Sequence, residues 1–143
     1  MPVRALLIVV LLLFGACAQP PPPQVDLLAP NDAQMKLRSL QTRTFEVADR
    51  DAAIRSVIAT LQDLGFIIER ANAPLGLVTA ARFAEPNFQD VIGVTVTVRP
   101  QSDGKMLVRA NAIYNNRPVE EPEVYQNFFA ALERSLFVGR AEH

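Results

Sequence analysis

Residues that could act as acids, bases or nucleophiles are few in this chain and lie far apart. The densest carboxylate group is Glu120, Glu121 and Glu123, which surround Pro122. Two carboxylates can share acid and base work when one is buried and the other is solvated. Acidic residues are also typical of the first turn of a helix, where they complement its dipole, and we favour that interpretation. The only histidine, His143, is the last residue and offers no serine a triad partner. The sequence therefore predicts no enzymatic activity.

Composition also argues against cofactors, metals and nucleic acids. The chain has 14 Lys and Arg against 15 Asp and Glu, well mixed, so no basic block exists that would neutralise phosphates. One cysteine and one histidine do not suffice for a zinc site. The six glycines are scattered and form no phosphate-binding loop. We expect no nucleic-acid partner, no metal and no cofactor.

The only cysteine, Cys17, ends a stretch that has three parts. Residues 1–4 carry one positively charged side chain, residues 5–14 are ten consecutive apolar residues, and Gly15 and Ala16 follow. A charged start, an apolar middle and a small-residue exit are typical of a secretory signal peptide. A helix that spans a bilayer needs about 20 apolar residues, so this run is too short. The sequence predicts a signal peptide over residues 1–16.

Phe14-Gly15-Ala16-Cys17 resembles the bacterial lipoprotein signal, although Phe14 stands where leucine is usual. The resemblance implies cleavage before Cys17, a diacylglyceryl thioether on its sulfur and a third acyl chain on its amine. Two or more acyl chains anchor a protein stably, whereas one holds it marginally. Because Ala18 rather than aspartate follows, lipoprotein sorting implies the outer membrane, with the domain facing the periplasm. The alternatives are a secreted protein or an uncleaved N-terminal anchor, with Cys17 incidental.

Residues 17–38 are predicted to be a tether between the lipid and a folded domain. Pro20–Pro23 are four consecutive prolines, which favour a polyproline II spacer of about 12 Å. The same run can serve as a ligand for a proline-binding groove. Directly beside a lipidated cysteine, a stalk is the preferred interpretation.

Residues 39–143 are predicted to form one α+β domain. Asp49 is a predicted N-cap and Gly65 a helix stop, and Pro122 begins a second helix that runs to residue 138. Period-two alternation and β-rich composition predict the strands, which cover 41–47, 66–70, 75–83, 92–98 and 106–114. The order β-α-β-β-β-β-α predicts a two-layer sandwich, a mostly antiparallel sheet with both helices on one face.

The last two strands are expected to pair as a hairpin around the sequence PQSDGK. Pairing Val98 with Met106 brings the apolar residues of both strands to the same face of the sheet. That register also sets Val96 opposite Val108.

This element order resembles the helix-grip domains of small envelope lipoproteins, including those of the third lipoprotein of the outer-membrane barrel-assembly machine. More closely, residues 39–138 resemble a group of short bacterial lipoproteins. The matching motifs are Gln41-Thr42-Arg43-Thr44-Phe45, Leu61-Gln62-Asp63-Leu64-Gly65-Phe66, Leu75-Gly76 and Tyr125-Gln126-Asn127-Phe128-Phe129. None of these motifs is catalytic, so the resemblance implies kinship rather than an activity.

The sheet face opposite the helices is the predicted interaction face, because arginine and exposed aliphatic residues suit a protein interface. Its predicted members are Ile67, Val78, Arg82, Thr95, Thr97, Leu107, Arg109, Asn111 and Ile113. A plain solvent-facing sheet is the alternative. Phe83 and Phe88 in the loop 82–90 are interpreted either as an aromatic anchor or as residues that close the core.

The sequence suggests two alternative functions. The first is a lipid-anchored, non-enzymatic domain that binds another envelope protein, because confinement to a membrane lets a weak interface suffice. The second is a binding module for an anionic or cell-wall glycan ligand, which would use Arg82, Arg99 and Arg109.

Overall fold

The computed structural model describes residues 29–86 and 88–141. The predicted signal peptide, Cys17, the proline run and His143 lie outside these residues. Along the chain the elements are α2 (Asp32–Leu40), β1 (Thr42–Phe45), α3 (Arg50–Asp63), β2 (Ile67–Asn72), β3 (Leu77–Phe83), β4 (Val91–Pro100), β5 (Met106–Tyr114), β6 (Arg117–Pro118) and α4 (Pro122–Ala141).

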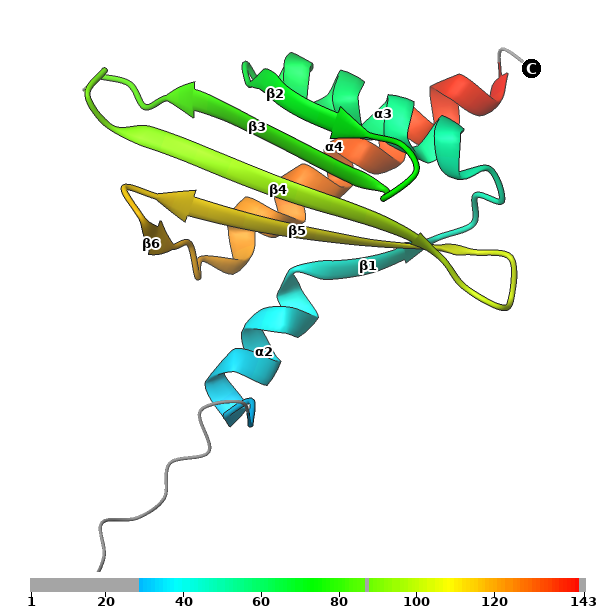
Figure 1. Ribbon diagram of the computed structural model, residues 1–143, viewed down its shortest axis with the longest axis horizontal. Helices are drawn as coiled ribbons and strands as arrows, with labels where there is room; N and C mark the ends of the chain where they lie inside the picture. Colours follow the sequence, from blue (N-terminus) through cyan, green and yellow to red (C-terminus); the bar gives the residue numbers. More distant parts are fainter. Residues whose placement is uncertain (1–28, 87, 142–143) are drawn as a thin grey trace, which may run out of the picture.

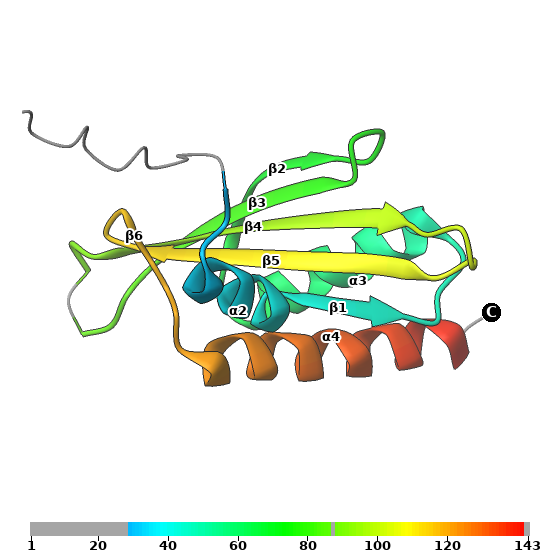
Figure 2. The ribbon, with the colours of Figure 1, turned by 90° about the horizontal axis from the view of Figure 1, so that it is seen from below.

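The strands form one antiparallel sheet in the order β1-β5-β4-β3-β2. The short strand β6 pairs with the end of β5, along the same edge as β1. Helices α3 and α4 lie together on one face of the sheet, and no described helix covers the other face (Figures 1 and 2). This arrangement confirms the predicted α+β two-layer sandwich.

Helix α3 begins and ends where the sequence predicts. The Asp49 side chain accepts a hydrogen bond from the Asp51 backbone N–H at 2.9 Å, which caps the helix. Gly65 follows the last turn with φ of +82°, a conformation that glycine adopts without strain. The buried face of the helix includes Val57 and Leu61.

The predicted register of the β4–β5 hairpin is wrong by two residues. Val98 pairs with Val108, and Pro100 rather than Val98 pairs with Met106. The strands extend further than predicted because the connecting loop is short, closed by a hydrogen bond from the Gln101 N–H to the Lys105 carbonyl at 2.8 Å. A shift of two residues preserves side-chain direction, so both apolar sets still face the helices.

Helix α2 begins inside the segment predicted to be a tether without helical period. Asn31 caps it by accepting from the Gln34 backbone N–H at 2.8 Å, and the Gln34 side chain accepts from the Asn31 N–H. This reciprocal pair is a capping box, whose N-x-x-Q spacing was visible in the sequence. Leu37 and Leu40 pack against the hydrophobic core. Regular structure in the described residues therefore begins at Asp32, before residue 39.

Candidate functional site

Two local turns bring side chains to one end of the helix-covered face. After α3, the Phe66 N–H donates to the Leu61 carbonyl and the Gly65 N–H donates to the Gln62 carbonyl, both at 2.9 Å. This pair of bonds is the Schellman motif, which is usually accompanied by a contact between its flanking apolar residues. The motif turns the chain so that Phe66 lies beside the end of α3 and lines the same hollow as Leu61.

The second turn is a hairpin that the sequence analysis missed. Asn115 and Asn116 have φ values of +47° and +64°, as a two-residue type I′ turn requires. Tyr114 and Arg117 pair across this turn, so Arg117 points to the helix side of the sheet with Tyr114. The Asn-Asn pair was the available signal, because asparagine is favoured at both central positions of such turns.

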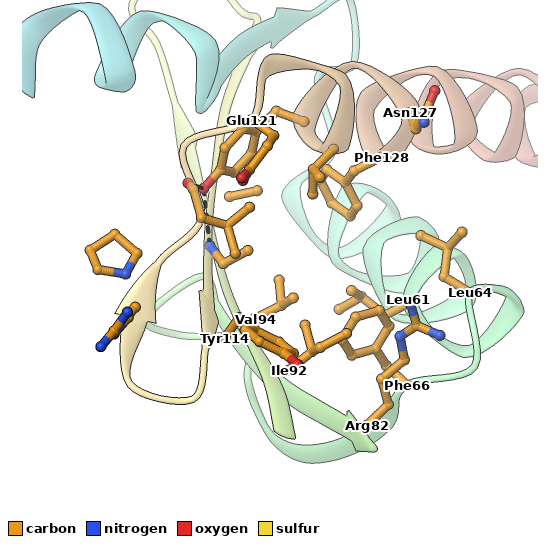
Figure 3. Close-up of a pocket in the computed structure, with 17 residues that line it drawn as sticks. Leu61, Leu64, Phe66, Arg82, Ile92, Val94, Tyr114, Glu121, Asn127 and Phe128 are labelled. Atoms are coloured by element: carbon orange, nitrogen blue, oxygen red, sulfur yellow. Dashed lines mark hydrogen bonds between the residues drawn. The ribbon is translucent and has the colours of Figure 1, made fainter. Parts of the chain in front are cut away.

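Between these turns lies a cleft of about 580 Å³. Its walls are the end of α3, the first turns of α4 and the hairpin of β5 and β6. Its floor is the sheet, where Val94, Ala110 and Ala112 are small enough to leave space below the helices. In Figure 3 the side chains of Leu61, Phe66, Ile92 and Phe128 surround this hollow. The cleft is predominantly apolar, with a volume in the usual range for ligand sites, about 300–1,000 Å³.

A buried polar network supports the wall where α4 begins. Tyr125 is almost fully buried, and its hydroxyl donates to the Val119 carbonyl at 2.6 Å. The same oxygen accepts from Gln41 Nε2 at 3.1 Å and from the Ala112 N–H at 3.4 Å. These bonds link β5, the segment after β6 and the chain after α2. They hold the wall in place, because leaving such groups unpaired would cost about 1–3 kcal/mol each.

Two arginines contribute charge to the cleft. The Arg82 guanidinium lies 5.1 Å from the centre of the Phe66 ring, a cation–π contact. Arg117 lines the opposite side. Within residues 29–86 and 88–141, neither guanidinium is in an ion pair. Glu121 also lines the cleft, but its Oε2 accepts from the Glu120 N–H at 3.1 Å.

Tyr114 is held at the end of the sheet by Asp90. Its hydroxyl donates to Asp90 Oδ2, and Asn115 Nδ2 donates to Asp90 Oδ1 at 2.7 Å. The hydrogen bond to the carboxylate raises the pKa of the Tyr114 phenol above its usual value. At neutral pH Tyr114 is therefore an uncharged part of the cleft wall. The Asp90 carboxylate accepts hydrogen bonds from the uncharged side chains of Tyr114 and Asn115.

Seven of the nine residues of the predicted interaction face lie on the open face of the sheet. The strand pairing puts Ile67, Thr95, Thr97, Leu107, Arg109, Asn111 and Ile113 on the face that α3 and α4 leave open. Val78 and Arg82 were assigned to the wrong face. Val78 pairs with Val96 and is completely buried under the helices, while Arg82 pairs with Ile92 and lines the cleft.

The alternative reading of the loop 82–90, that its phenylalanines close the core, is wrong. Phe83 is 58% exposed and Phe88 is 66% exposed. Phe83 pairs with Val91 on the open face of the sheet. Neither ring lines the cleft.

Among the residues that the structure describes, no group of three or more His, Cys, Asp or Glu side chains is arranged to hold a metal ion. Within the same residues, no helix combines the length and the apolar character needed to cross a bilayer.

The comparisons with known proteins are sparse. No family model and no curated protein matches the sequence. Among solved structures, the chain is similar to the adenylate sensor from AMP-activated protein kinase, crystallised in complex with ZMP. The two are 11% identical, with a TM-score of 0.49, over 66% of this chain and 94% of the other. A likeness of this size supports no statement about function.

Proposed function

We propose that this chain is a lipid-anchored, non-enzymatic binding protein of the bacterial envelope, and that its binding site is the cleft bounded by the end of α3, the first turns of α4 and the β5–β6 hairpin. The observation that carries the proposal is an apolar hollow of about 580 Å³ whose wall holds two guanidinium groups that make no ion pair with any described residue. A large apolar pocket with a few polar groups is the usual form of a binding site.

The energetics favour an apolar occupant. Filling such a space with an apolar group the size of a leucine or phenylalanine side chain contributes about 1.5–3 kcal/mol. Attachment through Cys17 would confine the domain to the membrane surface and raise its effective concentration for neighbouring ligands. A modest affinity would then suffice for function.

A second candidate function uses the open sheet face as a docking surface for an acidic envelope protein. Its paired positions include Arg70, Arg99 and Arg109, and Glu69 lies beside Arg70 in the bulge of β2. They also include Thr42, Thr44, Thr79, Thr95 and Thr97. A face with cations and hydroxyl groups complements an acidic surface.

One cross-linking experiment in intact cells separates the two candidates. A photoreactive residue is placed at Val124 in the cleft, at Leu107 on the open face, or at Gln62 on the exposed side of α3 as control. We expect a specific adduct from Val124 alone, identified by mass spectrometry. A specific protein captured only from Leu107, in a salt-sensitive manner, would favour the open face. If Val124 behaves like Gln62, the cleft is not the binding site.

The anchor has its own test. Replacing Cys17 with serine removes the only thiol that can carry the lipid, so the variant should accumulate as an unlipidated precursor. The wild type should partition into the detergent phase after phase separation, with a mass that includes the acyl chains. Equal partitioning of wild type and variant, both with an unprocessed N-terminus, would mean that residues 5–14 are the anchor.

A further inference from the structure

We infer that the cleft binds an amphipathic anion, a single acyl chain whose carboxylate or phosphate head lies between Arg82 and Arg117. This inference rests on the proposed function of the cleft and adds the chemical class of its ligand.

The first step is the position of the two arginines. Arg82 pairs with Ile92, Ile92 pairs with Tyr114, and Tyr114 pairs with Arg117. The four residues form one row across β3, β4, β5 and β6, with an arginine at each end. Neighbouring strands lie about 4.8 Å apart, so the two Cα atoms are roughly 14 Å apart. Arginine side chains are long and flexible, so we expect both guanidinium groups to be able to contact one anionic group placed between them.

The second step is the chemistry of the charged groups along the cleft. The carboxylate of Glu121 accepts a backbone N–H, and that of Asp90 accepts the donors of Tyr114 and Asn115. The two guanidinium groups have no ion-pair partner within the described part of the chain. Guanidinium donors match the oxygens of a carboxylate or phosphate, often in a bidentate manner. Within the described residues the cleft therefore offers two guanidinium groups to an anion, against the one carboxylate of Glu121.

The third step is the shape of the apolar part. From the arginine row the floor continues along β5 through Ala112 to Ala110. The four steps along β5 from Tyr114 to Ala110 correspond to about 13 Å of strand. Leu61, Phe66 and Phe128 enclose this length from the helix side. An apolar cleft with cations at one end can accommodate one acyl chain, and each methylene buried there would contribute about 0.8 kcal/mol.

The test uses the mature lipoprotein in phospholipid nanodiscs, with empty nanodiscs as blank. The probe is dodecanoate that carries a diazirine on its terminal carbon, and labelled peptides are mapped by mass spectrometry. We expect labelling of the peptides that contain Leu61 and Phe128. Unlabelled dodecanoate and dodecyl phosphate should compete at least tenfold better than dodecanol or dodecyltrimethylammonium, which have the same chain without the negative charge.

Matched variants test the role of the arginines. Arg82→Gln with Arg117→Gln should weaken dodecanoate binding about tenfold or more, because charge-assisted bonds are lost. Arg38→Gln with Arg134→Gln removes the same charge from exposed positions outside the cleft and should change nothing. Thermal unfolding of both double variants checks that the fold is intact.

The outcomes separate the inference from the proposed function. If all four dodecyl compounds compete equally and the variant with Arg82→Gln and Arg117→Gln binds normally, the ligand needs no anionic head group, although the cleft is a binding site. If no probe labels the peptides that line the cleft, the proposal that the cleft is a binding site is wrong. Tighter binding of dodecanoate supports a free fatty acid as ligand, and tighter binding of dodecyl phosphate or lysophosphatidylglycerol supports a phospholipid.

Discussion

Replacing Gly76 with alanine is expected to lower the free energy of unfolding by about 3 kcal/mol or more. Gly76 lies in the turn between β2 and β3 with φ of +63°. A Cβ atom there would lie 2.1 Å from the carbonyl oxygen of Val98, which belongs to the backbone of β4. The Val98 N–H donates to the Gly76 carbonyl at 2.7 Å, so the two backbone segments cannot move apart without losing that bond.

Gly104→Ala is the matched control for this prediction. Gly104 also has positive φ, +78°, but no atom lies within 4 Å of the Cβ that alanine would add. Only the conformational cost remains, which is about 1–2 kcal/mol. Urea denaturation of both variants measures the difference. Equal losses of unfolding free energy in the two variants would contradict the close approach of the Gly76 and Val98 backbone segments. Gly76 would then be required only for its positive φ.

Replacing Phe129 with alanine is expected to lower the free energy of unfolding by about 3–5 kcal/mol. Phe129 is 1% exposed and lies at the centre of an aromatic cluster. Its ring centroid is 5.2 Å from that of Phe128 and 6.2 Å from that of Phe45, and the Arg43 guanidinium lies 5.1 Å from it. The substitution would remove these contacts and leave a cavity between α4 and the sheet.

Phe137→Ala provides the control on the same helix. Phe137 is 73% exposed, so its truncation should change stability by no more than about 0.5 kcal/mol. The two variants have the same change of side chain in the same helix, and they differ in burial. Thermal and chemical unfolding should agree on the ranking, and comparable losses at the two positions would refute the assignment of Phe129 to the core.

Much of the fold was predictable because helix and strand periods are local properties. The N-cap at Asp49, the stop at Gly65 and the alternation of β4 and β5 predict their elements without knowledge of the neighbours. The resulting fold class was correct. The lipid anchor at Cys17 stays a prediction from residues 1–17.

The cleft was not predictable in the same way. In β3, the set Val78, Ala80 and Arg82 is no more apolar than the set Leu77, Thr79 and Ala81, so alternation alone does not choose the buried face. Pairing with β4 decides it, because Val78 must lie beside Val96.

The chain by itself therefore determined α3, α4 and strands β1 to β5, their order and the layer that they form, since these depend on short-range patterns, whereas α2 and β6 were missed. Tertiary structure decided which face Arg82 occupies, the two-residue shift of the hairpin and the hollow above Ala110 and Ala112. Each of these depends on contacts between residues distant in the sequence. A cavity in particular is the space that several elements leave unfilled, and no single segment encodes it.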